Sequence, residues 1–239
     1  DESDDQITLT SNISAKEIRI FGYAGNDTIT ITGTMIATNA FTIDTGDDDD
    51  TVTVTETGSI TVSNGNVTVD TRSDAEKEGE TETDSEADTI QIDGAITASG
   101  NVSFTTGVGE DVVTITGAVS AGNISINTGD DHDIVTIDID ANEGRRLTGP
   151  VQIYGGDGTD WITVNKLHTR TDDVMDIDGE GGTDDVVVNI RGGATAYLIN
   201  VTDTGSPYDG ADTLTINGTD NADVFLLREK FVAYLNQNG

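Results

Sequence analysis

The stretch GGDGTDWIT, from Gly155 to Thr163, places three glycines and two aspartates directly before an alternating apolar run. Glycines permit positive φ angles, so a turn built from them brings its carbonyl oxygens close together. The aspartates add carboxylate oxygens at the same place. Calcium is a hard cation that takes about six to eight oxygen ligands in flexible geometry. This combination of residue types therefore favours the binding of a divalent cation by oxygen ligands alone.

The same kind of stretch returns along the chain, with variants that begin at Gly22, Thr45, Thr106, Thr128 and Gly179. The aspartate that precedes each apolar alternation defines nine repeat positions: Asp5, Asp27, Asp50, Asp88, Asp111, Asp133, Asp160, Asp184 and Asp212. Subtraction gives spacings of 22, 23, 38, 23, 22, 27, 24 and 28 residues. Five of these eight spacings lie between 22 and 24 residues, which indicates an internal repeat.

The spacing of 38 residues contains an insertion. The segment 71–87, TRSDAEKEGETETDSEA, is polar and acidic, has no large apolar residue, and stands where the other copies have a short turn. A long insertion at one turn of a repeat is tolerated because the cost of loop closure grows slowly with length. We expect 71–87 to form a surface loop.

Each repeat contains three short stretches in which apolar and polar residues alternate. Ile29 and Ile31 follow the aspartate, a glycine-led stretch such as Ile60–Val62 comes next, and a third stretch such as Phe41–Ile43 leads back to the turn. Alternation with period two places one set of side chains inside and the other outside. Three short strands in about 22 residues fit one coil of a parallel β-helix, in which coils stack roughly 4.8 Å apart.

The sequence therefore predicts an all-β fold, a parallel β-helix of about nine coils with ~22–28 residues each and stacked Gly/Asp-rich turns. One such domain would span 1–239, with the insertion at 71–87 and an irregular C-terminal coil at 217–239. The alternative is a β-sandwich of short strands. A sandwich needs antiparallel hairpins with dissimilar turns, whereas here one type of turn returns at one period.

Composition narrows the classes of partner. The chain has 11 Lys and Arg residues against 45 Asp and Glu residues, which gives a formal net charge of −34. This charge disfavours nucleic acids and anionic membranes as partners and favours cations. The absence of cysteine excludes disulfides and thiolate sites. No apolar run approaches the ~20 residues of a membrane span, and the opening Asp1–Asp5, which has no signal peptide, suggests a piece of a longer chain.

Stacked turns would bring carboxylates about 4.8 Å apart, and such carboxylates repel one another unless a cation lies between them. The sequence thus predicts a ladder of calcium ions along one edge. The candidate metal ligands are the last aspartate of each turn and the acids in the middle of three turns: Asp27, Asp50, Asp111, Asp133, Asp160 and Asp184, with Asp48, Asp131 and Asp157. The alternative is that these aspartates only form turns and keep the protein soluble.

The stretch Gly155–Thr163 fits the nonapeptide pattern GGxGxDxUx at every position, with Ile162 as the large apolar residue. In this it resembles the hemolysin-type calcium repeats (RTX-like) of giant bacterial surface proteins and adhesins. The resemblance covers the turns of about six of the nine repeats and does not cover the coil length. The arrangement of strands is more similar to the three-sided helices of pectate lyases and adhesins. The resemblance implies bound calcium, a secreted or cell-surface location, and a role as stalk, fibre or adhesin.

Other functions have weaker support in the sequence. Only two histidines, His132 and His168, are present, and the basic residues are scattered, so the sequence predicts no enzyme. Outward threonines resemble an ice-binding array, but Gln91, Trp161 and Val187 interrupt it. Trp161 lies beside the best-matching turn, and an exposed indole there would stack on a sugar ring. The alternative function is therefore a carbohydrate-binding or polysaccharide-processing β-helix. The expected partners are neighbouring repeats of the same chain, further copies in a fibre, or surface glycans.

Overall fold

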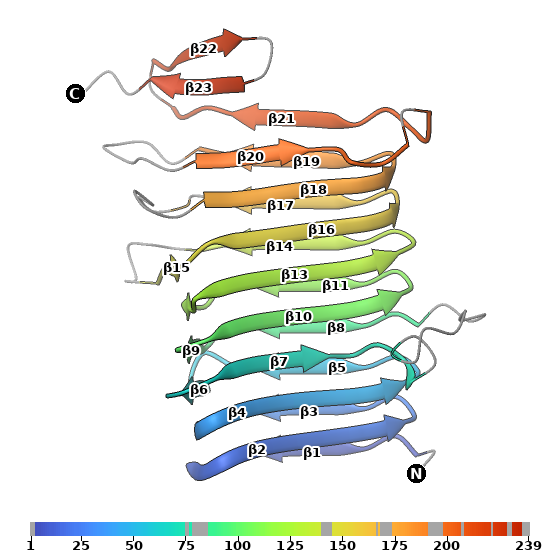
Figure 1. Ribbon diagram of the computed structural model, residues 1–239, viewed down its shortest axis with the longest axis vertical. Helices are drawn as coiled ribbons and strands as arrows, with labels where there is room; N and C mark the ends of the chain where they lie inside the picture. Colours follow the sequence, from blue (N-terminus) through green and yellow to red (C-terminus); the bar gives the residue numbers. More distant parts are fainter. Residues whose placement is uncertain are drawn as a thin grey trace.

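The computed structural model describes residues 3–235, except 75–76, 78–85, 140–144, 166, 168–173, 191–197, 207, 221 and 229–230. The chain winds into a β-solenoid whose coils stack along the long axis of the molecule, with the N-terminus at one end (Figure 1). Neighbouring strands in the two solenoid sheets are parallel, so the predicted parallel β-helix is confirmed.

Among the described residues, the first sheet contains nine strands, one for each aspartate repeat position, in a solenoid of about eight turns. Its neighbouring strands pair without a shift in register, so that Ile29 lies between Ile7 and Val52. In order, the strands of this nine-stranded sheet are β1 (Gln6–Leu9), β3 (Thr28–Ile31), β5 (Thr51–Val54), β8 (Thr89–Ile92), β11 (Val112–Ile115), β14 (Ile134–Asp138), β17 (Trp161–Asn165), β19 (Asp185–Asn189) and β21 (Thr213–Asn217).

The second sheet contains twelve strands and forms the rest of the coil wall. Its longer strands are β2 (Ile13–Ala24), β4 (Thr34–Asp47), β7 (Asn66–Asp70), β10 (Asn101–Val108), β13 (Asn123–Asp130), β16 (Val151–Gly158), β18 (Val174–Gly182) and β20 (Leu198–Thr202). Its shorter strands are β6 (Ser59–Val62), β9 (Ala95–Ala98), β12 (Val119–Ser120) and β15 (Leu147–Thr148).

The coils from β5 to β16 each have three separate strands, as the sequence predicts. In the first two coils, the second and third stretches run together as the single strands β2 and β4. β4 pairs with β6 through Thr34–Ala37 and with β7 through Ala40–Asp44, so one strand continues around a corner of the coil.

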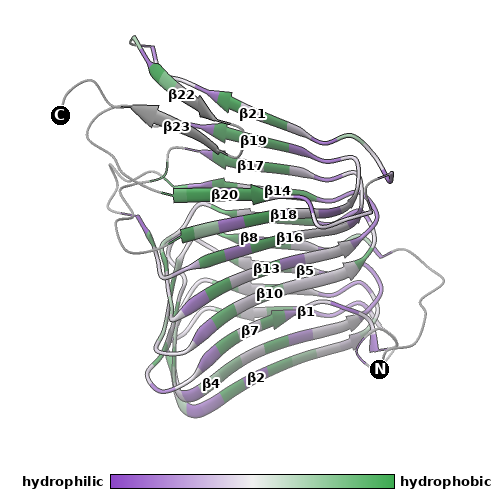
Figure 2. Cartoon of the chain, turned by 45° about the horizontal axis from the view of Figure 1, so that its top comes forward, coloured by the Kyte–Doolittle hydropathy of each residue, from purple (hydrophilic) through white to green (hydrophobic). Residues whose placement is uncertain are grey.

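The core is a column of aliphatic side chains inside the coils. Ile29, Val52, Ile90 and Val113 occupy equivalent positions in successive coils and are fully buried. Hydrophobic and hydrophilic segments alternate along the same strands in Figure 2. Complete burial of one such side chain contributes about 1.5–3 kcal/mol. A thin core can therefore stabilise the rod because every coil adds its own members.

The chain leaves the solenoid after β21. Here β22 (Val224–Arg228) and β23 (Phe231–Leu235) form an antiparallel pair separate from both solenoid sheets. The region predicted as an irregular coil, 217–239, thus contains a hairpin. The insertion predicted at 71–87 lies between the ends of β7 and β8, and only 71–74, 77 and 86–87 of it are among the described residues. Within the described part of the chain, no helix has the length and apolar character needed to cross a membrane.

Candidate metal site in the stacked turns

The Gly/Asp-rich turns form one edge of the rod, where the twelve-stranded sheet passes into the nine-stranded sheet (Figure 1). The second residue of each of several turns has a positive φ, as in Gly46 (98°), Gly129 (105°) and Gly156 (108°). A Cβ on Gly46 would clash with the carbonyl oxygen of Tyr23 in the preceding coil. Glycine is therefore required here both by the backbone conformation and by the close stacking of the turns.

Asp48 and Asp131 occupy a second left-handed position of the turn, with φ of 78° and 84°. Glycine fills this position in another turn, where Gly25 has a φ of 105°. Aspartate adopts this conformation more readily than most residues because its short side chain forms local hydrogen bonds. Both side chains are exposed, and Asp48 Oδ2 accepts a hydrogen bond from the Gly25 backbone N–H at 3.0 Å.

The last aspartate of each turn points into the coil. The inner aspartate column consists of Asp27, Asp50, Asp88, Asp111, Asp133, Asp160 and Asp184, whose side chains are at most 2% exposed. In each case Oδ1 accepts a hydrogen bond from the backbone N–H of the equivalent residue in the preceding coil. For example, Asp160 accepts from Asp133 at 2.9 Å and Asp184 accepts from Asp160 at 3.0 Å. The series runs from the Asp5 N–H, bonded to Asp27 at 2.7 Å, to Asp212, which accepts from Asp184 at 3.0 Å.

Six of the nine predicted metal ligands thus belong to one buried column, and the other three lie outside it. Asp88 and Asp212 share the hydrogen-bonding pattern but were absent from the predicted ligands. Both residues could have been predicted from their repeat position, since each precedes an apolar alternation.

The first residue of the turn distinguishes two kinds of coil. The turns that end at Asp27, Asp160 and Asp184 begin with glycine, and a Cβ on that glycine would clash with Oδ2, as Gly155 shows for Asp160. The turns that end at Asp50, Asp88 and Asp133 begin with threonine, and the threonine hydroxyl lowers the pKa of the carboxylate. Both kinds of coil contain a buried Oδ2 without a hydrogen-bond partner, on Asp27, Asp50, Asp133, Asp160 and Asp184.

The pKa of Asp160 is raised to about 7, mainly by burial; the hydrogen bond from the Asp133 N–H lowers it, and the negative charges of Asp184 and Glu180 raise it. Burial is also the main cause of the raised pKa of the other strongly affected members, about 7 for Asp50, 8 for Asp88, 8 for Asp133 and 6 for Asp184. No ion pair found among the described side chains includes a member of the column. Its charge must therefore be compensated by protons or by added cations.

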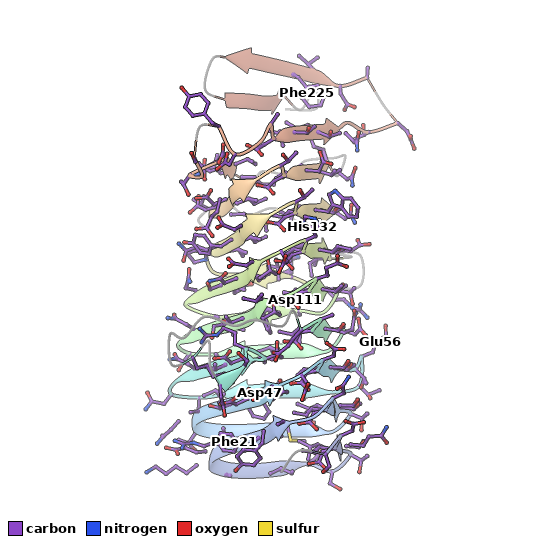
Figure 3. All side chains as sticks on the ribbon, turned by 90° about the vertical axis from the view of Figure 1, so that its right-hand side faces the viewer. Phe21, Asp47, Glu56, Asp111, His132 and Phe225 are labelled. Atoms are coloured by element: carbon purple, nitrogen blue, oxygen red, sulfur yellow. The ribbon has the colours of Figure 1, made fainter. Side chains whose placement is uncertain are left out.

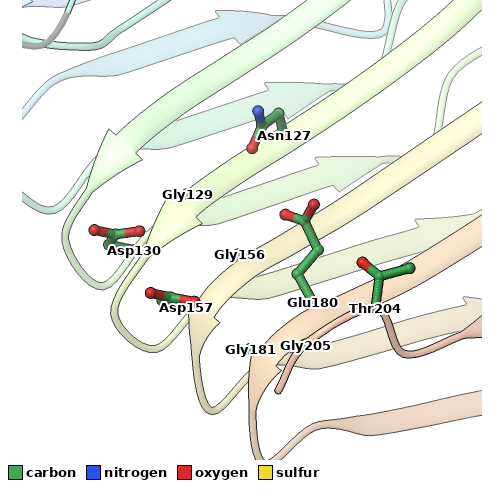
Figure 4. Close-up of a pocket in the computed structure, with 9 residues that line it drawn as sticks. All are labelled: Asn127, Gly129, Asp130, Gly156, Asp157, Glu180, Gly181, Thr204 and Gly205. Atoms are coloured by element: carbon green, nitrogen blue, oxygen red, sulfur yellow. The ribbon is translucent and has the colours of Figure 1, made fainter. Parts of the chain in front are cut away.

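Outside the column, Asp157 contributes to a shallow groove on the turn edge together with Asp130 and Glu180 (Figure 4). Burial raises the pKa of Asp130 and of Glu180, and neighbouring carboxylates, including Asp157, add to the effect. Figure 3 shows this edge of the rod, with acidic side chains along it. The predicted ligands did not include Asp130 or Glu180. Asp130 occupies the same position in its turn as Asp157, so the repeat could have indicated it, whereas Glu180 pairs in register with Gly156.

The carboxylates do not form a complete metal site by themselves. Among the residues that the structure describes, no three His, Cys, Asp or Glu side chains converge into a group able to hold a metal ion. An ion beside the inner column would therefore take one carboxylate oxygen from a coil and complete its shell with backbone carbonyl oxygens or water, both of which calcium accepts. The buried, unpartnered Oδ2 atoms fit such a ligand.

Two residues with other predicted roles are also described. His132, at the turn edge, accepts a hydrogen bond from the Thr159 N–H at Nδ1, at 3.0 Å. Trp161 is 54% exposed on the outer face of β17, in register with Ile134 on one side and Asp185 on the other. Comparisons with family models, with curated proteins and with solved structures found no match to this chain.

Proposed function

We propose that this chain is a non-enzymatic, calcium-binding structural rod, a repeat segment of a long secreted or cell-surface protein that serves as stalk, fibre or adhesin. The observation that carries the proposal is the set of buried Oδ2 atoms without a hydrogen-bond partner on Asp27, Asp50, Asp133, Asp160 and Asp184. A buried acceptor without a donor is destabilising by about 1–3 kcal/mol, and more when it is charged. A bound cation removes this penalty and also the repulsion between coils.

The calcium ions would be held at the turns by the inner column. Asp27, Asp160 and Asp184 are the first candidates, because their second oxygen lacks the threonine hydroxyl that faces Asp50 and Asp133. Bound calcium supplies positive charge between stacked carboxylates. The exposed acids Asp48, Asp131 and Asp157 add negative potential at the edge where an ion enters.

A structural role is favoured over catalysis by the position of the perturbed acids. The carboxylates with the most strongly raised pKa values are at most 2% exposed and engaged in hydrogen bonds between coils. A general acid must reach the proton acceptor of its substrate, and these groups face the interior. Their repetition from coil to coil suits a rod that is extended by adding coils.

Asp160→Asn tests the proposal because the amide keeps a carbonyl oxygen for the Asp133 N–H and removes the charge. We expect the melting temperature of the wild-type chain to rise with calcium concentration. One site at 100 times its Kd contributes about 2.7 kcal/mol, or roughly 5–10 °C for a chain of this size. Asp160→Asn should melt close to the wild type in chelator and lose part of the calcium-induced rise.

The matched control is Asp157→Asn in the same turn, which removes an exposed charge and should keep nearly all of the rise. Calorimetric titration counts the ions bound by each variant. Equal melting of the wild-type chain in chelator and in calcium would contradict the proposal. An equal rise with sodium alone would point to charge screening rather than to bound calcium.

A further inference from the structure

The turn TGDDDD, in the second coil, contains four consecutive aspartates and is held from both sides. Asp48 and Asp50 accept backbone N–H groups from the preceding coil, at 3.0 Å from Gly25 and 2.7 Å from Asp27. Asp47 and Asp49 accept N–H groups from the two ends of the insertion. These bonds come from Asp74 at 2.7 Å and from Ala87 at 2.8 Å. The described ends of the insertion are therefore attached to this turn.

The insertion also brings two positive charges to acids of the neighbouring strands. Lys77 Nζ donates to Asp44 Oδ1 at 2.6 Å, and only 18% of the Lys77 side chain is exposed. Arg72 donates to both carboxylate oxygens of Asp70, from Nε at 2.9 Å and from Nη2 at 2.8 Å. Asp44 and Asp70 are themselves partners in register on β4 and β7. Two adjacent carboxylates thus each have a cationic side chain of their own.

The same edge has a different composition further along the rod. Around β13, β16 and β18, the acids Asp130, Asp157 and Glu180 line the groove of Figure 4, and its described lining includes no Lys or Arg. Asp178, in register with Tyr154 on β16, accepts hydrogen bonds from the backbone N–H and the hydroxyl of Thr204, both at 3.0 Å. At this part of the edge, neutral groups are the observed partners of the acids.

We infer that Lys77 and Arg72 are built-in counter-ions that take the place of a soluble cation at Asp44 and Asp70. The inference rests on the proposed function, because it states which part of the acidic edge needs calcium and which does not. An ion pair that is partly removed from water is stronger than an exposed ion pair. A bidentate arginine–carboxylate pair also fixes the relative orientation of the two side chains. The insertion thereby compensates Asp44 and Asp70, on β4 and β7, without calcium.

Lys77→Gln tests this by removing the charge from a side chain of similar length. Without Lys77, Asp44 lies beside other acids with no fixed cation, and calcium should take over the compensation. We expect Lys77→Gln to melt below the wild type in chelator and to recover in calcium. Its calcium-induced rise should exceed the wild-type rise by roughly 2–4 °C, the shift that corresponds to about 1 kcal/mol at this size.

Two controls separate charge from other effects. Lys77→Arg keeps the charge and should behave as the wild type. Lys16→Gln removes a charge from an exposed lysine of β2 and should shift the melting temperature equally in chelator and in calcium. If calcium raises the melting temperature of the wild type and of Lys77→Gln equally, this inference alone is overturned. If calcium raises the melting temperature of Lys77→Gln but not that of the wild type, the proposed function alone is overturned. If calcium raises neither melting temperature, both are overturned.

Discussion

Asp157 and Asp160 belong to the same turn, lie three residues apart and have the same side chain, yet the structure uses them differently. Asp160 is 1% exposed and accepts the Asp133 N–H of the preceding coil, whereas Asp157 is exposed at the groove. The same contrast in burial separates the whole inner aspartate column from the outer acids Asp48 and Asp131, although Asp48 also accepts an N–H from the preceding coil. The position in the turn and the direction of the side chain, rather than the residue type, therefore decide whether an acid is buried inside the coil or faces solvent.

The largest expected difference between the two groups comes from alanine substitution. Asp160→Ala leaves the buried Asp133 N–H without its acceptor, which destabilises by about 1–3 kcal/mol. Asp157→Ala changes an exposed position and should stay within about 0.5 kcal/mol. Chemical denaturation in calcium at pH 7 measures both. Similar losses in the free energy of unfolding of the two variants would show that the inner and outer acids contribute equally to stability.

A second difference is the dependence of stability on pH in chelator. The inner carboxylates have folded-state pKa values raised to between about 6 and 8, above the ordinary value of 3.8. A raised pKa means that the folded state binds protons more tightly than the unfolded state. Stability should therefore increase as pH falls from 8 towards 5. A difference of one in pKa between the two states is worth about 1.4 kcal/mol, or ~3–6 °C in melting temperature.

The assignment of this slope to the inner column is tested by variants and by calcium. Asp160→Asn should reduce the slope, because it removes one buried titrating group, whereas Asp157→Asn should leave the slope nearly unchanged. Calcium should flatten the slope, since protons and calcium compete for the same carboxylates. A protein that melts at lower temperature at pH 5 than at pH 8 in chelator would show that the column is not protonated on folding.

The smallest effect on stability is expected on the outer face of the rod. Trp161 is 54% exposed on β17, so Trp161→Ala should change stability by about 0.5 kcal/mol or less. The wild-type chain tests the alternative carbohydrate-binding function, in which the indole would stack on a sugar ring. Quenching of the fluorescence of this single tryptophan by neutral and acidic oligosaccharides gives the readout. Saturable quenching would favour glycan binding, and a flat titration would leave the structural rod as the better proposal.

Much of the fold could be predicted from the sequence because it follows from local rules. The spacing of the repeated aspartates gave the coil and the number of strands in the nine-stranded sheet, and the alternation around Ile29 and Ile31 identified buried positions. The fusion of two stretches into β2 or β4 and the hairpin after β21 were not predictable. They depend on how the chain continues around a corner and at the end of the stack, where no repeat constrains it.

The candidate site was predictable in position but not in arrangement. The sequence placed aspartates in stacked turns, and stacking alone brings equivalent residues into neighbouring positions. It did not reveal that Asp130 and Glu180 line the groove with Asp157, or that Lys77 reaches Asp44. These contacts join side chains from different coils or from the insertion, and their geometry depends on rotamers and on the path of the backbone between repeats.

The sequence by itself determined the period, the alternation and the positions of glycine and aspartate, because each of these is a property of residues close together in the chain. Only the tertiary structure decided which oxygen of each aspartate accepts a hydrogen bond from another coil and which is buried without one. Oδ1 finds its donor in an N–H of the preceding coil, 22–38 residues away, and this bond exists only after the coils have stacked. The same stacking buries Oδ2 of Asp27, Asp160 and Asp184 away from water. Aspartates that the sequence places in turns therefore form a buried column of carboxylates, whose negative charge must be compensated by protons or cations.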